Sequence, residues 1–316
     1  MSAFRVVPLA FVIVAGALAP PPALAVQATT PEVAGQGFSV TPPTMEIIGS
    51  PGEVVKRPLV VENPADRAQP AEFEFKNFAA DGEDGRPSFT TDVTDYPLAS
   101  WMSVNTNRVL VGPKQVVGAE ITVRIPKDAP PGGHYGAILV RTVVPVNPGE
   151  SAVAVLPEVA SLVLLRVSGE THENLAVESF GSTKKLFKSG PIPYEVRMRN
   201  TGNVHVRTSG KVVVKDVLGR RVDQVDLVEA TVLPSSVRRF PAQVKGKWFF
   251  GPHRATATMT YGTSRGTVTA STTTWFINLR AVAIASAIVM LALILYLLGR
   301  RSARPKRGEN AGKHAR

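Results

Sequence analysis

The C-terminal end of the chain places the strongest constraint on its fold. An unbroken apolar run extends from Ala281 to Leu298, and the tail 299–316 then carries seven Lys/Arg against the single acid Glu309. At 1.5 Å per residue the run makes about 27 Å of helix, which is close to the thickness of the hydrocarbon core of a bilayer. Basic clusters mark the cytoplasmic end of a span. The sequence therefore predicts one transmembrane helix over 275–298 and a basic cytoplasmic tail over 299–316.

A second apolar stretch, Val6 to Leu18, follows Arg5 near the N-terminus. Ala23-Leu24-Ala25 offers the small residues that a signal peptidase requires, and three prolines at 20–22 would interrupt a helix. These features predict a signal peptide over 1–25; the alternative is an uncleaved N-terminal anchor. Cleavage would leave a single-pass plasma-membrane protein whose N-terminal domains are extracytoplasmic and whose tail is cytoplasmic.

The residues that flank the predicted span suit the membrane–water interface. Aromatic rings favour the headgroup region, and long basic side chains can extend their charge towards it. The predicted interface residues are Trp275, Phe276, Arg280, Arg300 and Arg301.

Charge differs between the two halves of the segment between the apolar ends. Residues 26–169 hold 11 Lys/Arg against 16 Asp/Glu, whereas residues 170–274 hold 16 against 8. A basic segment beside a membrane favours anionic lipid headgroups or an anionic wall polymer as its partner. We do not expect nucleic acid as a partner on that side of a membrane.

The chain contains no cysteine. An extracytoplasmic protein without disulfides depends on hydrophobic cores for stability, and thiol catalysis and Cys-based metal sites are excluded. No P-loop, dinucleotide fingerprint or His-Glu-x-x-His motif is present either. We therefore expect no catalytic residue, no metal and no cofactor, and a protein that is not an enzyme.

Between the apolar ends, the pattern is that of short β-strands. Leu59–Val61, Ala71–Phe75 and Glu120–Ile125 are β-branched or aromatic runs, and turns rich in Pro, Gly, Asn and Asp separate them. No amphipathic helix is evident, and the length suits two domains of ordinary size. The predicted fold class is all-β, with two tandem Ig-like β-sandwiches followed by one C-terminal transmembrane α-helix.

The second half repeats motifs of the first. A strand in each half ends in an asparagine, Asn63 or Asn200, whose side chain can bond the backbone two residues on. Val109–Pro113 is echoed by Thr231–Pro234. This alignment places the first sandwich at 26–169 and the second at 170–274.

Each half also closes with a predicted hairpin. The first joins Tyr135–Val144 to Val159–Val167, and the second joins Ala255–Tyr261 to Thr267–Phe276.

The order of these motifs resembles that of a known group of proteins. It runs through "FSVTPPTMEIIGSPGEVVKRPLVVENPADRAQPAEFEF", "DGEDG", "YPLASWMSV", "IPKDAPPGGHYGAILV", "PIPYEVRMRNTGNVHV" and "FGPHRATATMTYG" before the anchor and basic tail. In this it is similar to bacterial surface proteins with two Ig-like domains that are related to the WxL-interacting protein family. The resemblance implies an N-terminal domain that binds peptidoglycan, and a surface protein as a further partner.

Two segments of the first half are candidate ligand-binding loops, because loops on a rigid scaffold commonly carry recognition. The first holds Asp81, Glu83 and Asp84, which are either turn formers beside glycine or a weak calcium site. The second holds His134 and Tyr135 at the entry to a strand, where a structural role is the alternative.

The basic residues of the second half also admit two interpretations: an ordinary solvated surface, or a surface that faces an anionic partner. They include Lys184, Lys185, Lys188, Arg220, Arg221, Arg238 and Arg239. The aromatic run Trp248–Phe250 is a further candidate for interfacial contact.

Together these features favour a non-enzymatic, membrane-anchored cell-envelope protein that binds or scaffolds at the cell surface, with peptidoglycan or another wall component as a possible ligand. The alternative is a structural or assembly subunit of a membrane complex that contacts protein partners.

Overall fold

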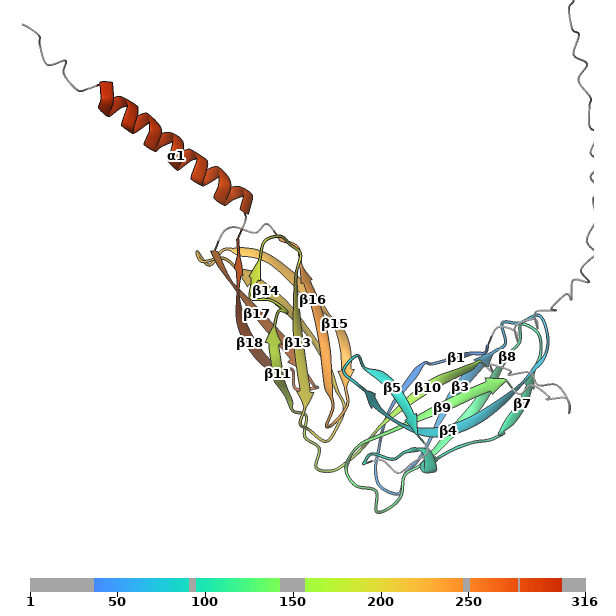
Figure 1. Ribbon diagram of the computed structural model, residues 1–316. Helices are drawn as coiled ribbons and strands as arrows, with labels where there is room; N and C mark the ends of the chain where they lie inside the picture. The colour runs from blue at the N-terminus through green and yellow to red at the C-terminus, as the bar shows by residue number, and fades with distance from the viewer. Residues whose placement is uncertain (1–36, 91–94, 143–156, 247–250, 278, 303–316) are drawn as a thin grey trace, which may run out of the picture. The chain divides into compact units, whose positions relative to one another are not determined.

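The computed structural model describes residues 37–90, 95–142, 157–246, 251–277 and 279–302. These residues form two β-sandwiches and a C-terminal apolar helix, which confirms the predicted fold class (Figure 1). The signal peptide predicted at 1–25, the aromatic run Trp248–Phe250 and the tail from residue 303 lie outside the described residues.

The first sandwich consists of two sheets. One has the strand order β1-β3-β8-β6, and the other has the order β2-β10-β9-β4-β5, with β7 also paired to β4. The strands are β1 (Ser39–Thr41), β2 (Thr44–Gly49), β3 (Val54–Glu62), β4 (Gln69–Asp81), β5 (Arg86–Thr90), β6 (Met102–Val104), β7 (Arg108–Val111), β8 (Val116–Arg124), β9 (Gly132–Thr142) and β10 (Glu158–Val167), with the 3-10 helix η1 at Ala99–Trp101.

The second sandwich has the same construction. One sheet has the order β11-β13-β16, and the other has the order β12-β18-β17-β14-β15. The strands are β11 (Leu175–Gly181), β12 (Leu186–Phe187), β13 (Ile192–Asn200), β14 (Val206–Lys215), β15 (Arg221–Val232), β16 (Val237–Val244), β17 (Gly251–Tyr261) and β18 (Gly266–Phe276).

The internal repeat is visible in the strand pairing. In both halves the last two strands form an antiparallel hairpin, β9–β10 or β17–β18, as the sequence predicts. In both, the last strand also pairs in parallel with a short early strand, β2 or β12. Each half therefore closes its second sheet in the same way.

Alternation along the strands builds a separate core in each half. On β3, for example, Val55, Leu59 and Val61 point inward while their neighbours are exposed. Large side chains such as Leu59 and Ile121 fill the first core, and Tyr194 and Met198 fill the second. These cores supply the stability that the chain does not draw from disulfides.

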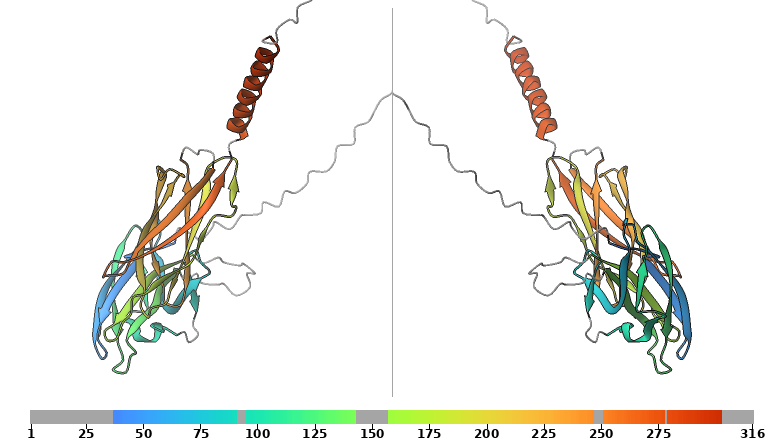
Figure 2. Two further views of the ribbon diagram at one scale, coloured as in Figure 1. Left: turned by 90° about the vertical axis from the view of Figure 1, so that its left-hand side faces the viewer. Right: turned by 90° about the vertical axis from the view of Figure 1, so that its right-hand side faces the viewer.

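The last strand of the second sandwich leads almost directly into the apolar helix. Only Ile277 and Asn278 separate β18 from α1 (Leu279–Ser302) in the sequence, and Figure 2 shows both elements from two sides. Within α1, residues 282–301 are long and apolar enough to cross a membrane, and they are exposed in the structure. α1 begins four residues after the start of the predicted span 275–298 and ends four residues after its end.

One predicted interface residue proves to be a core residue. Phe276 is buried in the second core, whereas its neighbour Trp275 is exposed. The reason is that both belong to β18, where successive side chains point to opposite faces of the sheet. Arg280 lies in the first turn of α1, and Arg300 and Arg301 lie in its last turn.

Candidate functional site

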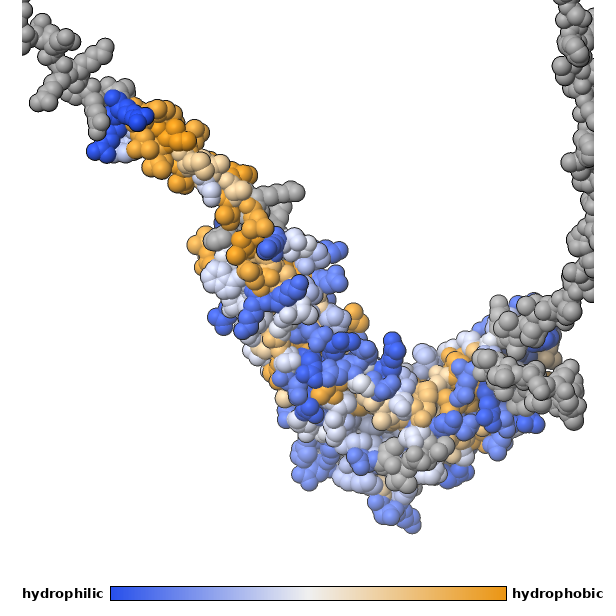
Figure 3. All heavy atoms as spheres, viewed as in Figure 1, coloured by the Kyte–Doolittle hydropathy of each residue, from blue (hydrophilic) through white to orange (hydrophobic). Residues whose placement is uncertain are grey.

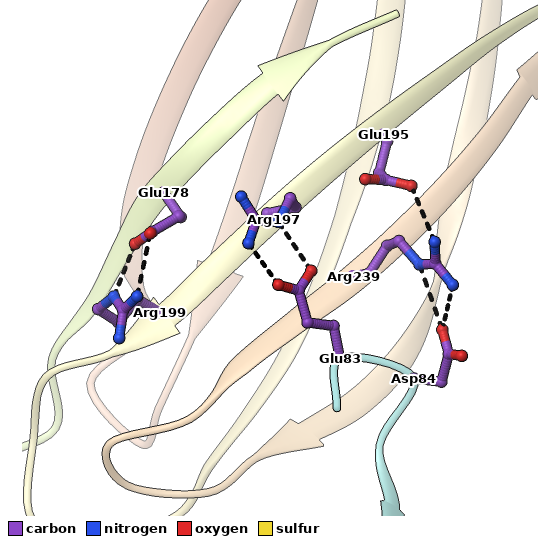
Figure 4. A network of polar contacts seen from close by, with 7 residues as sticks. All are labelled: Glu83, Asp84, Glu178, Glu195, Arg197, Arg199 and Arg239. Atoms are coloured by element: carbon purple, nitrogen blue, oxygen red, sulfur yellow. Dashed lines mark hydrogen bonds and ion pairs between the residues drawn. The ribbon is translucent and has the colours of Figure 1, made fainter. Parts of the chain in front are cut away.

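The acidic loop of the first sandwich contacts the second sandwich. Gly82–Gly85 form the turn between β4 and β5, and both glycines adopt positive φ, which favours glycine at these turn positions. Figure 4 shows Glu83 and Asp84 pointing from this turn towards basic side chains on β13 and β16. The loop thus occupies a junction between the two sandwiches, which we call the junction loop.

The contacts of the junction loop are charge-assisted. The Arg197 guanidinium donates two hydrogen bonds to the Glu83 carboxylate, with Nε 2.7 Å from Oε2. Arg239 donates to Asp84 Oδ1, at 2.5 Å from Nη2, and its Nη1 lies 3.5 Å from Glu195 Oε2. The Arg239 backbone N–H also donates to the Glu83 carbonyl at 2.8 Å. The fork of an arginine matches a carboxylate in this way and fixes the direction of approach.

These partners keep the two loop acids ionised. The hydrogen bond from Arg197 lowers the pKa of Glu83, and the hydrogen bond from Arg239 lowers the pKa of Asp84. Asp84 is exposed and Glu83 is only half-buried at the edge of the contact, so each pair adds specificity of docking more than stability. Asp81, the third acid of the predicted site, is exposed and has no ion-pair partner among the described residues.

His134 and Tyr135 are not surface residues, contrary to the expectation for a ligand loop. Both are almost fully buried, at 2% and 1% exposure. The two ring nitrogens of His134 lie 3.0 Å from the carbonyl oxygens of Pro97 and Pro130, and its ring contacts Trp101. Because they lie on successive positions of β9, His134 faces the first core and Tyr135 faces the opposite side of the sheet. Their geometry favours structural roles.

Tyr135 belongs to an apolar patch on the outer face of the first sandwich that packs against the second. Phe78, Ala137 and Leu164 cluster around it, and Leu233 of the second sandwich packs on the cluster. The Tyr135 hydroxyl lies 3.4 Å from His205 Nδ1. This burial raises the pKa of the Tyr135 phenol, so the group stays neutral.

Backbone contacts bring the two halves closer still. The Gly133 N–H donates to the Asn203 carbonyl at 2.8 Å. Gly132 has φ +132°, and a Cβ there would lie 2.9 Å from the same carbonyl oxygen. Glycine at the first position of β9 therefore permits this close approach, which a side chain would obstruct.

A pocket opens beside the junction loop. Its walls are mostly apolar, its volume is about 110 Å³, and both sandwiches line it. Phe78, Leu162, Leu164 and Leu233 provide apolar walls, and Arg86 and Arg238 provide guanidinium groups. Neither arginine has an ion-pair partner among the described residues, and desolvation lowers the pKa of Arg238. Arg238 Nη1 donates to the Thr231 carbonyl at 2.7 Å, and Arg86 lies close enough to Asp84 to help lower the pKa of that carboxyl. The pocket therefore combines an apolar lining with two guanidinium groups that form no ion pair with the described residues.

The segment between the sandwiches is hydrogen-bonded on both sides. The Ser168 N–H donates to the Gly49 carbonyl at 2.9 Å, and the His172 N–H donates to Asn203 Oδ1 at 2.7 Å. Arg166 donates to Glu173, which in turn accepts from the Thr263 N–H at 2.8 Å. The connection is thus held by polar contacts and not left as a free linker.

The described residues show no arrangement typical of catalysis. No group of three or more His, Asp or Glu side chains among them could hold a metal ion. Gly262–Gly266 spells Gly-x-Ser-x-Gly, but it is the turn of the β17–β18 hairpin and no helix follows it. A nucleophile elbow requires a strand-to-helix turn, so Ser264 does not sit in one.

Comparison with known proteins gives similarity at the level of structure alone. No protein-family model matches the chain, and no curated protein matches its sequence. The structure aligns with a chaperone–tip adhesin complex of CFA/I fimbriae biogenesis at a TM-score of 0.42 and 11% identity, over 74% of this chain and 97% of that one.

Two further solved structures are similar to about the same degree. The class 5 fimbriae chaperone CfaA gives a TM-score of 0.39 at 12% identity, over 74% of this chain and 98% of that one. The E. coli chaperone DraB gives 0.36 at 13% identity, over 74% and 97%. The two-sandwich architecture itself rests on the strand pairing described above.

Proposed function

We propose that the protein is a non-enzymatic scaffold of the cell envelope, anchored by α1, whose two sandwiches together hold a protein partner at the pocket beside the junction loop. The observation that carries this proposal is the pocket itself, with apolar walls from Phe78, Leu162 and Leu233 and the guanidinium groups of Arg86 and Arg238. Such a lining suits an apolar side chain accompanied by a carboxylate.

The same lining favours protein over peptidoglycan as the ligand. Glycan chains present hydroxyl groups and are typically held by polar side chains, whereas the pocket offers mostly apolar surface. Binding of a wall component, which the resemblance to the WxL-interacting proteins implies, remains the second candidate.

Anchoring in the plasma membrane is part of the proposal. The apolar length of α1 supports it, as do Arg300 and Arg301 in the last turn, on the side expected to be cytoplasmic. Because the chain has no cysteine, single cysteines can report topology without further changes. We expect Val228→Cys to react with a membrane-impermeant maleimide on intact cells, and Ala311→Cys to react only after permeabilisation. Equal reactivity of both on intact cells would refute the topology.

The partner can be identified by photocrosslinking of the full chain in cells. A photoreactive amino acid at Leu233, in the pocket wall, should give a discrete protein adduct that Arg238→Glu abolishes. The same amino acid at Leu110, exposed on β7, serves as the control. Retention of the full-length protein on purified peptidoglycan, unaffected by Arg86→Glu and Arg238→Glu, together with no adduct at Leu233, would contradict the protein partner and favour the wall component.

A further inference from the structure

The end of the second sandwich from which α1 leaves carries exposed apolar side chains. Val217 and Leu218 are 64% and 71% exposed, and Leu186 and Trp275 are 46% and 47% exposed. Side chains of this size are usually covered in a folded domain, and together they form one apolar tip. Figure 3 shows apolar side chains both on α1 and at this end of the sandwich, with hydrophilic ones among them.

Strand pairing brings these residues to the same end. Leu186 pairs with Trp275 across β12 and β18, and Pro252 at the start of β17 also pairs with Trp275. Val217 lies next to Gly251, where a Cβ would be 3.8 Å from Val217 Cγ1. We call this end, formed by 184–188, 215–221, 251–254 and 273–276, the helix-proximal end.

The turn that presents Val217 and Leu218 is rigid. The Leu218 and Arg220 N–H groups both donate to Asp216 Oδ1 at 2.9 Å, and Arg220 Nε donates to Oδ2 at 2.8 Å. Gly219 adopts a φ of +75°, which glycine tolerates best. The two apolar side chains are therefore held outward by a fixed β14–β15 turn, and their exposure is built into the fold.

Basic residues are frequent in the segments that carry the apolar tip. The four segments of the helix-proximal end contain one acid, Asp216, whose side chain is 5% exposed and pairs with Arg220. Their seven basic residues are Lys184, Lys185, Lys188, Lys215, Arg220, Arg221 and Arg254. Exposed apolar side chains accompanied by lysine and arginine are typical of a surface that binds anionic lipid.

Chain connectivity places this end beside the bilayer if α1 spans it. Phe276 and Leu279 are three residues apart, so their Cα atoms lie within about 11 Å of each other, whatever the angle between sandwich and helix. No long linker could carry the helix-proximal end away from the headgroups.

We propose that the helix-proximal end is a lipid-docking surface, which seats the second sandwich on an anionic bilayer by inserting Val217 and Leu218 among the headgroups. The inference rests on the proposed anchoring by α1. We assign lipid as the ligand of this surface because the exposed apolar side chains, the basic residues and the start of α1 all lie at one end of the domain. A protein partner at this end is the competing outcome of the test.

The test uses the full chain in nanodiscs of phosphatidylcholine with phosphatidylglycerol. A fluorophore that is sensitive to polarity is attached to Leu218→Cys, and to Val228→Cys on β15 as the control; Val228 is 83% exposed but lies outside the helix-proximal end. Headgroup-linked nitroxide lipids should quench the label at 218 roughly three-fold more strongly than the label at 228. Lys184→Glu, Lys185→Glu and Lys188→Glu combined should remove this difference.

A matched variant controls for the change in charge. Lys56→Glu, Lys114→Glu and Lys127→Glu alter net charge equally, but on exposed positions of the first sandwich, and should leave the quenching at 218 unchanged. Equal quenching at 218 and 228 would overturn the docking surface, as would a label at 218 that is shielded from water but not quenched by the lipids.

A third label separates this inference from the anchoring on which it rests. Leu291→Cys in α1 should be quenched by nitroxides in the acyl chains. If the label at 291 is quenched and that at 218 is not, the docking surface fails alone; if neither is quenched, the anchoring fails and the docking surface with it.

Discussion

Asn63 and Asn200 show how single residues hold each sandwich together. The Asn63 amide donates to the carbonyls of Arg67, Val111 and Gly112 at 2.8 to 3.0 Å, and the Asn200 amide donates to those of Val204 and Val232 at 2.8 and 2.9 Å. Their oxygens accept the N–H groups of Ala65 and Gly202, two residues on. Each buried side chain thus joins the end of one strand to a turn far along the chain.

Replacing either asparagine by alanine should destabilise its own sandwich. The buried carbonyls would lose their donors, and each unsatisfied group costs on the order of 1–3 kcal/mol, so we expect a loss of about 2–4 kcal/mol for Asn63→Ala or Asn200→Ala. Chemical denaturation of the full chain in detergent measures this loss. Asn105→Ala, at an exposed position, should change the free energy of unfolding by less than about 0.5 kcal/mol. A similar effect for all three would contradict the assignment.

We expect the contact between the sandwiches to depend on pH through His205. Desolvation lowers the pKa of His205; Arg166 and Arg207 lower it further, and Glu46 and Glu173 raise it. The folded state thus favours the neutral His205 ring. Its contribution to the stability of the folded protein is fully present above the ordinary histidine pKa of about 6.5 and is lost as the pH falls below that value. His205→Phe keeps an aromatic ring against Tyr135 but cannot titrate.

We therefore expect the stability of the native protein to fall more steeply than that of His205→Phe between about pH 7 and pH 5. Thermal unfolding of both proteins over this range measures the difference. Parallel curves for native protein and His205→Phe would contradict the role of His205.

Among the structural elements, the β4–β5 hairpin supplies two ion pairs and one backbone hydrogen bond of the contact between the sandwiches. Its turn presents Glu83 and Asp84 to β13 and β16, and the Glu83 carbonyl accepts the Arg239 N–H at 2.8 Å. Alanine at both Glu83 and Asp84 should release this contact and accelerate hydrogen exchange of the Arg239 amide. Asp81→Ala, in the same loop, should leave exchange at β16 unchanged. Faster exchange in Asp81→Ala alone would contradict the assignment.

Much of each element could be predicted from the sequence because local rules decide it. Period-two alternation marks β3 and β8, and the Asn63 and Asn200 turns follow from a side chain that bonds the backbone two residues on. The β17–β18 hairpin follows from its glycine-containing turn.

The junction could not be predicted from the sequence, because its partners lie far apart in the chain. Glu83 and Arg197 are 114 positions apart, and Tyr135 and His205 are 70 apart. An acid beside glycine predicts a turn but carries no information about a distant arginine. Phe276 lies in both the predicted strand Thr267–Phe276 and the predicted span 275–298, and its place in the second core follows from its position on β18.

On the scale of the whole molecule, the proposed scaffold consists of two sandwiches, the contact between them and one apolar helix. Apolar packing at Tyr135, ion pairs at the junction loop and a hydrogen-bonded connecting segment all oppose independent motion of the sandwiches. The ion pairs of Glu83 and Asp84 stabilise the folded protein at pH values above the ordinary pKa values of glutamate and aspartate. This stabilisation is lost as the pH falls below those values.

If these contacts hold the two sandwiches in one arrangement, the distance between the sandwiches should have a single value. Spin labels on Leu110→Cys and Val228→Cys, both exposed, report this distance by pulsed electron paramagnetic resonance on the full chain in nanodiscs. We expect a single narrow distribution that broadens when Glu83→Lys and Asp84→Lys are introduced, and that narrows again when Arg197→Glu and Arg239→Glu are added. A broad distribution in the otherwise native chain, unchanged by these substitutions, would show that the two sandwiches move independently.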